Sequence, residues 1–415
     1  MILFLKGIGS KFLNFAKWVA VSCIVGAVIG PVGAAFYYGL ELATEFRTER
    51  PGVILGLPLA GLVIVFLYHI AGKDNDRGTN SVLSAIRSEE RLTIAAAPLI
   101  FISTILTHLF GGSAGREGAA LQVGGSIGNG FGRLFGMDEA DRHVMIMCGM
   151  SACFAAVFGT PMAAAVFSME VVSVGIMYYS ALVPCVLASL VASGIAHALG
   201  TVAERMPVFD VPEFTWVNGG KTIVLAFFCA LLSVLFCVTL HAAEALGKKW
   251  IKNRYLRIAL AGLLIVLLAA LFGTGDYLGA GMNIIEKCME GEAVPGAFLV
   301  KILFTAITLG AGFKGGEIVP CFFVGATFGC MMGGVMGLPG SLCAAVGMAA
   351  LFCGVTNCPI TALLISLEVF GMEGFPYFLA GTAVSYMLSG YQSLYHTQKI
   401  IYSKYKAEYI GKKAE

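Results

Sequence analysis

The stretch "CGMSACFAAVFGTPMAAAVFSMEV" (148–171) decides the fold, because the chain contains it twice. It aligns without a gap to "VGMAALFCGVTNCPITALLISLEV" (346–369), at an offset of 198 residues. The identical pairs include Gly149/Gly347, Phe154/Phe352, Val157/Val355, Pro161/Pro359, Ser168/Ser366 and Glu170/Glu368. A match of this length predicts an internal duplication.

The segment that precedes each copy also matches, at an offset of 201 residues. Here "REGAALQVGGSIG" (116–128) aligns with "EIVPCFFVGATFG" (317–329), and the two share a valine and two glycines. We therefore divide the chain into a first repeat, 12–200, a second and inverted repeat, 221–395, and a short C-terminal tail, 396–415.

The composition places both repeats in a membrane. Of the 415 residues, 58% are hydrophobic and 13% are charged, whereas a soluble globular protein has roughly 45–50% apolar and about 25% charged residues. A helix needs about 20 apolar residues to span a bilayer, and apolar runs close to that length recur along the chain. The sequence predicts an all-α, polytopic membrane protein with about ten or more spans. The predicted segments lie near 12–40, 53–71, 93–112, 144–170, 174–200, 221–246, 257–273, 297–313, 341–355 and 374–394.

Two hydrophobic segments, Gly111–Gly136 and Gly310–Gly337, are too rich in glycine to be simple spans. Such sequences are typical of broken helices that cross part of the membrane inside a protein. In transporters built from inverted repeats, the substrate binds near the middle of the membrane, where the repeats meet. We therefore expect the functional site at these two segments.

Lysine and arginine gather in three places, which indicates the orientation. Under the positive-inside rule these loops and both termini lie in the cytoplasm, and we expect the chain in the cell membrane with an uncleaved N-terminus. The net charge of +2 gives no reason to expect a nucleic-acid partner. The clusters are Lys6, Lys11 and Lys17; Lys248, Lys249, Lys252, Arg254 and Arg257; and Lys399, Lys404, Lys406, Lys412 and Lys413.

The twelve cysteines lack the CxxC or Cys/His spacing of metal ligands. We interpret them as small buried hydrophobic residues, and we expect no metal and no cofactor.

In each repeat, a glycine cluster and then a proline mark two helix starts within the membrane. The glycine clusters span positions 115–118 and 315–316, and the prolines are Pro161 and Pro359. A helix start carries unpaired N–H donors and about half a positive charge, so several starts aimed at one point would form an anion site. The sequence therefore predicts a small anion as substrate.

Glu117 follows the first glycine cluster and is itself an anion. We expect its carboxylate to occupy the site made by the helix that starts at its own turn, and to leave that site when it is protonated. A proton and an anion would then compete for one position, which is what exchange coupling requires. The alternative is a local ion pair or capping arrangement between Arg116 and Glu117.

These residues resemble the CLC family of chloride channels and proton-coupled anion exchangers. The resemblance covers nearly the whole membrane domain, and it implies the CLC-type inverted-repeat helical fold and a homodimer with one pathway per subunit. Its motifs are "GREG" (115–118), "VGGSIG" (123–128), "FGTPMAAAVFSME" (158–170), "GGEIVP" (315–320) and "SLYHT" (393–397).

The resemblance also implies roles for individual residues. Glu117 corresponds to the external gating glutamate, and Tyr395 lines the inner end of the anion path with its hydroxyl as a donor. The other pathway residues that the motifs carry over are Gly115, Arg116, Gly118, Gly316, Ile318 and Val319.

Three departures from the family pattern affect the expected function. The family's "GREGP" ends here in Ala119. Its serine motif "GSGIP" is replaced by "DRGTNSV" (76–82), in which Thr79 is the best equivalent and Arg77 and Asn80 are alternatives. The internal proton-transfer glutamate of chloride/proton exchangers falls on Val171.

In "GGEIVP", Glu317 stands where the family has an apolar residue in "GIFAP". A carboxylate inside a membrane is costly unless it does work with protons or ions. Together with the other departures it resembles the fluoride-exporting branch of the family, so we infer a fluoride/proton antiporter with Glu317 as a second coupling acid. The alternative for Glu317 is a plain ion pair with Lys314.

Other functions and other roles remain as hypotheses. A chloride/proton antiporter and a passive chloride channel fit the same family. A membrane enzyme with Glu117, Glu317 and His108 as acid and base would need an aqueous domain or long polar loops, so we expect no enzyme. We interpret Glu170 and Glu368 as structural pairing near helix ends, and Thr107 and His108 as core residues.

Overall fold

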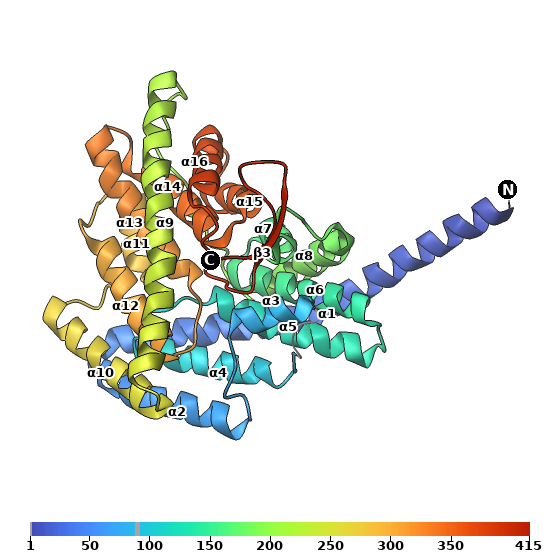
Figure 1. The fold of residues 1–415 in the computed structure, drawn as a ribbon, viewed down its shortest axis with the longest axis horizontal. Coiled ribbons are helices and arrows are strands. Elements are labelled where there is room, and N and C mark those ends of the chain that lie inside the picture. The colour runs from blue at the N-terminus through green and yellow to red at the C-terminus, as the bar shows by residue number, and fades with distance from the viewer. Residues whose placement is uncertain (1, 88–91) are drawn as a thin grey trace.

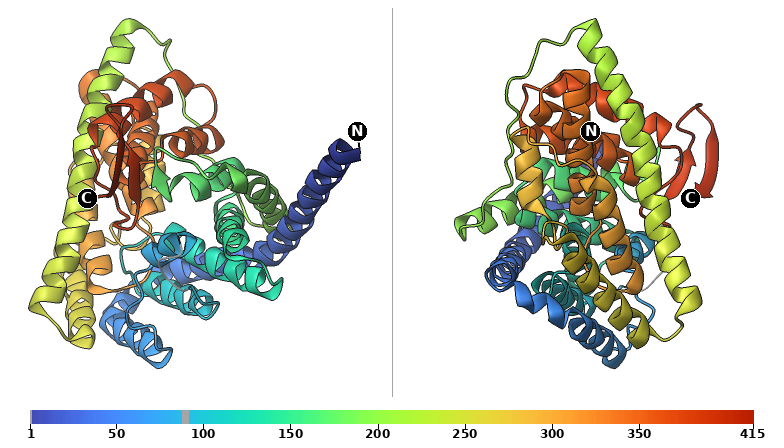
Figure 2. Two further views of the ribbon diagram at one scale, coloured as in Figure 1. Left: turned by 45° about the vertical axis from the view of Figure 1, so that its right-hand side comes forward. Right: turned by 90° about the vertical axis from the view of Figure 1, so that its left-hand side faces the viewer.

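The computed structural model describes residues 2–87 and 92–415, and in these residues the chain forms sixteen α-helices, two short 3₁₀ helices and three short strands. Figure 1 shows α9 (Trp216–Trp250) running along one side of the molecule, while α1 (Ile2–Glu49) extends away on the opposite side. Figure 2 shows that the N-terminus lies at the far end of α1 and that the C-terminus lies against the helical body.

The helices follow one another with short connections. Up to residue 200 they are α1, η1 (Pro51–Gly56), α2 (Leu57–Ile70), α3 (Thr79–Ile86), α4 (Ala96–Leu109), α5 (Glu117–Leu134), α6 (Glu139–Phe158), α7 (Pro161–Glu170), η2 (Tyr179–Ala181) and α8 (Leu182–Ala198). They continue with α9, α10 (Arg254–Phe272), α11 (Met282–Met289), α12 (Ala297–Ala311), α13 (Ile318–Met336), α14 (Gly340–Thr356), α15 (Pro359–Phe370) and α16 (Phe375–Leu388).

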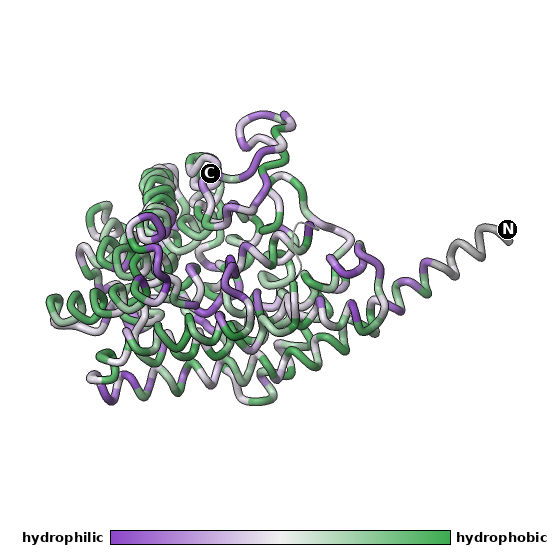
Figure 3. Tube along the Cα trace, turned by 60° about the horizontal axis from the view of Figure 1, so that its bottom comes forward, coloured by the Kyte–Doolittle hydropathy of each residue, from purple (hydrophilic) through white to green (hydrophobic). Residues whose placement is uncertain are grey.

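The helices have the lengths and apolar surfaces of membrane segments. Among the described residues, seven are long and apolar enough to span a bilayer, and five apolar helices are shorter. Figure 3 shows hydrophobic residues along the outer helices and polar residues gathered mainly in the connections. The prediction of a helical, multi-pass membrane protein with partially spanning helices is confirmed.

The two copies of the quoted stretch fold alike, because in both a helix ends with a left-handed residue at the equivalent position. Helix α6 ends at Gly159 with φ +70°, and α14 ends at Asn357 with φ +60°. Both are left-handed helix ends, which glycine and asparagine adopt most readily. Pro161 and Pro359 follow two residues later, each as the first residue of a new helix, where proline's missing N–H costs nothing.

Shared glycines let neighbouring helices touch through their backbones. A Cβ at Gly149 would lie 2.1 Å from the carbonyl oxygen of Gly124, and a Cβ at Gly347 would lie 2.2 Å from that of Gly325. These pairs join α5 to α6 and α13 to α14, so the repeat preserves both the glycines and the close packing that needs them. This packing fixes where α5 and α13 begin.

The C-terminal tail is folded, which the all-α prediction did not foresee. Strands β2 (Lys399–Tyr402) and β3 (Tyr409–Lys413) form an antiparallel hairpin, and β2 pairs in parallel with β1 (Ser173–Val174). The Gln398 side chain donates to the carbonyl oxygens of Val171 and Thr356, so the tail is held to both copies of the quoted stretch.

The glycine contact gives the first prediction. Gly149→Ala should lower the free energy of unfolding by about 1–3 kcal/mol, because a methyl group cannot fit against the Gly124 carbonyl without moving a helix. Gly334→Ala is the matched control, since a Cβ there has no neighbour within 4 Å. Thermal unfolding in detergent compares the two variants, and equal melting temperatures would show that the close approach is unimportant.

Candidate functional site

The starts of α5 and α13 are joined directly to each other. The Gly115 N–H donates to the Gly316 carbonyl oxygen at 2.7 Å, and the Gly316 N–H donates to the Gly115 carbonyl oxygen at 2.7 Å. A Cβ at Gly316 would lie 2.7 Å from the Gly118 nitrogen, so this contact requires glycine. The bridge holds the two broken helices end to end inside the protein.

The Glu117 carboxylate occupies the place where these helix starts meet. Its Oε2 accepts hydrogen bonds from the Val319 N–H at 3.2 Å and from the Arg116 N–H at 3.1 Å. The side chain is fully buried, and its Oε1 has no partner among the described residues. The carboxylate thus spans its own turn and the start of α13 in the opposite half, rather than resting on α5 alone as we expected.

The Arg116 guanidinium points away from this carboxylate. It forms an ion pair with Glu204 and lies 4.8 Å from the centroid of the Phe158 ring and 5.4 Å from that of Tyr37. The local ion pair between Arg116 and Glu117 is therefore not what the structure shows, whereas the capping arrangement is present in the hydrogen bond from the Arg116 N–H to Glu117 Oε2. Arg116 reaches the site through its backbone N–H.

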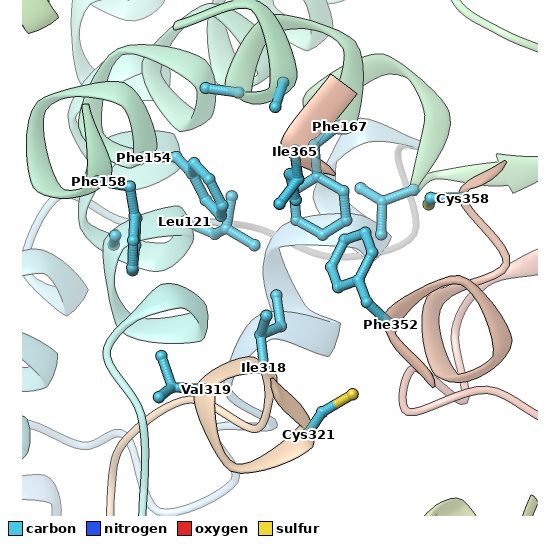
Figure 4. Close-up of a cluster of buried hydrophobic side chains, with 14 of the residues drawn as sticks. Leu121, Phe154, Phe158, Phe167, Ile318, Val319, Cys321, Phe352, Cys358 and Ile365 are labelled. Carbon is cyan, nitrogen blue, oxygen red and sulfur yellow. The ribbon is translucent and has the colours of Figure 1, made fainter. Parts of the chain in front are cut away.

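Ile318 and Val319 also contribute through the backbone. Figure 4 shows their side chains turned into an apolar cluster with Leu121, Phe154 and Phe352. Their amide groups at the start of α13 are left at the site, where an unpaired helical N–H favours an anion.

A large cavity of about 690 Å³ approaches the site from one side, and we call it the vestibule. Helix α9, the residues before α3 and α13, and the segment 394–397 surround it. Its lining includes Asp76, Arg77, Thr79, Asn80, His241, Glu244, Lys248, Lys314, Glu317 and His396.

A second cavity of about 30 Å³, room for about one water, touches Glu117, Glu204 and Val319. No residue lines both cavities. Glu117 lines the second cavity and Glu317 lines the vestibule.

Among the three candidates for the family's serine position, Thr79 is the one that approaches the helix starts. A Cβ at Gly118 would lie 2.8 Å from Thr79 Oγ1 and 3.2 Å from Glu317 Oε2, so both side chains converge on Gly118. Asn80 instead accepts hydrogen bonds from the Thr397 N–H and hydroxyl. The Arg77 N–H donates to Ser81.

Glu317 does not pair with Lys314. The Lys314 ammonium lies 2.8 Å from Asp76 Oδ2 and 4.2 Å from the centroid of the Tyr68 ring. Glu317 Oε2 is buried and has no partner among the described residues, and the same is true of the Tyr395 hydroxyl. Because buried polar groups are normally satisfied, these atoms are available for an ion, a proton or water.

The helix starts at Pro161 and Pro359, which we expected at the anion site, are already occupied. Glu368 accepts from the N–H groups of Met162 and Ala163 at 2.9 and 2.8 Å. Glu170 accepts from those of Ile360 and Thr361 at 3.1 and 2.8 Å. Each glutamate caps the helix of the other half, so the structural interpretation of both is confirmed, and the N–H groups that they bind are not open to an anion.

Thr107 and His108 lie in α4 and bond to their own helix. The Thr107 hydroxyl donates to the Ser103 carbonyl oxygen, and His108 Nδ1 lies 2.9 Å from that of Thr104. Neither residue lines the vestibule or the second cavity. Their interpretation as core residues holds.

The family model for voltage-gated chloride channels matches residues 59–390. The chain belongs to the CLC family. It is 35% identical to a chloride/fluoride channel protein of Pseudomonas syringae pv. tomato, over 94% of this chain and 88% of that one. It is 27% identical to an H(+)/Cl(−) exchange transporter of Vibrio cholerae, over 88% and 85% of the two chains.

Solved structures agree with this family. A crystal structure of a CLC-type fluoride/proton antiporter superposes with a TM-score of 0.90 at 32% sequence identity, covering 94% of this chain and 99% of that one. A cyanobacterial Cl−/H+ antiporter, at 18% identity and a TM-score of 0.79, shares the fold. The predicted CLC-type inverted-repeat fold is confirmed.

The reciprocal caps give the second prediction. Glu368→Ala should lower the free energy of unfolding by about 1–2 kcal/mol, because two N–H groups in the first turn of α7 lose their acceptor. Glu373→Ala, at an exposed position in the next loop, is the matched control. Thermal unfolding in detergent compares them, and a Glu368→Ala protein as stable as this control would contradict the capping role.

Proposed function

We propose that this protein is a proton-coupled anion antiporter that exports fluoride in exchange for protons. The observation that carries the proposal is the buried Glu117 carboxylate on the Val319 N–H, at the start of a helix of the other half. A carboxylate in that position stands where a transported anion would bind.

Exchange follows from this competition. While Glu117 is ionised, it satisfies the N–H donors at the start of α13 and closes the passage. Protonation removes its negative charge and weakens its hold on those donors, so a mobile anion takes the position. The anion therefore binds only while Glu117 is protonated, and exchange results because that proton enters from the side to which the anion leaves.

The donors around the site favour fluoride. A small, strongly hydrated anion needs strong donors to replace its water, and charge-assisted hydrogen bonds are the strongest that side chains offer. Thr79 and Tyr395 have hydroxyl groups at the site, and a protonated Glu317 is a third donor. A CLC-type fluoride/proton antiporter is among the similar structures, which supports the same choice.

Two alternatives within the family remain outcomes of the test. A chloride/proton antiporter would need another internal acid, because Val171 is a buried apolar residue whose carbonyl oxygen accepts from Gln398. A passive channel would need a passage that stays open without proton binding, and one relative is named as a chloride/fluoride channel protein.

We place the protein in the cell membrane with both termini in the cytoplasm, since the cationic clusters at 6–17, 248–257 and 399–413 follow the positive-inside rule. Lys248 lines the vestibule, so the vestibule would face the cytoplasm. The resemblance to the family supports a homodimer with one pathway in each subunit.

The third prediction concerns the purified protein in liposomes. Vesicles loaded with fluoride should release it and take up protons at the same time, and a proton gradient alone should drive fluoride uphill. Fluoride and pH electrodes record both ions, with chloride and nitrate as comparison anions. Chloride transport as fast as fluoride transport, without proton movement, would refute the antiporter.

The fourth prediction isolates Glu117. Glu117→Gln should reduce proton movement to the background of protein-free vesicles, because the amide keeps the shape but carries no exchangeable acid. Any remaining anion flux should no longer respond to a pH gradient. Glu368→Gln is the control, since it changes a partly buried glutamate whose carboxylate caps a helix and lines neither cavity. An unchanged proton-to-anion ratio in Glu117→Gln would contradict the assigned role.

A further inference from the structure

A stacked pair of histidines lies in the wall of the vestibule. The rings of His241 and His396 are 3.6 Å apart at their centroids and tilted by 30°. His241 belongs to α9, and His396 follows Tyr395 in the segment that closes the other side. Both rings line the cavity that Glu317 also lines.

We propose that the His241–His396 pair is the proton acceptor that serves Glu317 in the wall of the vestibule. This inference rests on the proposed antiporter and adds the route by which its protons leave or enter. The chain has Val171 where chloride/proton exchangers have their internal glutamate, so the side chains that share the vestibule with Glu317 are the candidates for that acceptor.

Histidine suits this task because a neutral imidazole accepts a proton at one ring nitrogen and can donate from the other. Two imidazolium rings at this distance repel each other, so the pair holds one proton at a time. A neutral ring accepts the proton from Glu317 through water, which leaves Glu317 ionised and the ring positive. The ring then gives the same proton to vestibule water and returns to its neutral form.

The surroundings hold the pair in place and supply the connecting water. His241 Nε2 lies 3.5 Å from the Leu394 carbonyl oxygen, and Asn80 binds Thr397, so the segment around His396 is fixed from both sides. The vestibule volume of about 690 Å³ has room for about twenty waters at the volume each occupies in the liquid.

Several charged groups face the pair from the surrounding elements. On α9 they are Glu244 and Lys248, which form an ion pair with each other. Asp76 and Lys314 form a second pair, from the segments before α3 and α13. Arg77 and Glu317 complete the ionisable lining, so the other charged groups facing the histidines are two ion pairs, one cation and one acid.

The test is exchange by the reconstituted full chain carrying both His241→Gln and His396→Gln. Glutamine keeps a polar side chain but cannot carry the proton, so fluoride and proton rates should fall together by at least about tenfold, the low end for a lost proton-transfer group. Their ratio should not change, because the coupling acids are intact. Imidazole added on the vestibule side should restore most of the rate, because it supplies the lost proton acceptor from solution.

His69→Gln is the matched control, because this histidine is exposed and lines neither cavity. Wild-type rates in the double variant would overturn the proposal, and so would a slow variant that imidazole does not rescue. If the unaltered protein moves fluoride without protons, the antiporter itself fails. A coupled wild-type protein with an unaffected double variant refutes the histidine station alone.

Discussion

The contact between the Glu117 carboxylate and the Val319 N–H is the interaction on which this account depends. It brings an acid from one half of the chain onto a helix start of the other half, within a fully buried setting. A membrane interior offers no water to satisfy those N–H groups, so some negative charge or dipole must meet them. Here the Glu117 carboxylate supplies that negative charge. The same N–H groups, when the carboxylate leaves them, attract a mobile anion.

The scaffold around that contact is largely backbone. The Gly115–Gly316 bridge and the close glycine pairs between α5 and α6 and between α13 and α14 fix both helix starts without side chains. The other two helix starts of the repeat would have been equally attractive to anions, but Glu170 and Glu368 cap them. Because each of these glutamates caps a helix of the other half, the two helix starts are closed to a mobile anion and the halves are held together.

Much of this could be predicted from the sequence, because duplication and glycine spacing are written in the order of residues. The repeat of 148–171 at 346–369 indicates two matched halves, and the glycine clusters indicate where helices break. The ion-pair partners of the charged side chains could not be predicted, since they depend on how the two halves fold onto each other. Arg116 bonds Glu204 and Lys314 bonds Asp76, residues distant along the chain, although each has a glutamate nearby in sequence. The folded tail escaped prediction because β2 pairs not only with β3 but also with β1, which lies more than two hundred residues away.

The central claim is that Glu117 and the anion compete for the same N–H groups. Calorimetric titration of the purified protein with fluoride, repeated in buffers of different ionisation enthalpy, counts the protons taken up for each anion bound. The account predicts proton uptake that accompanies binding in the wild-type protein and a marked loss of that uptake in Glu117→Gln. Fluoride binding with no proton uptake in the wild type, or with the same uptake in the variant, would contradict it.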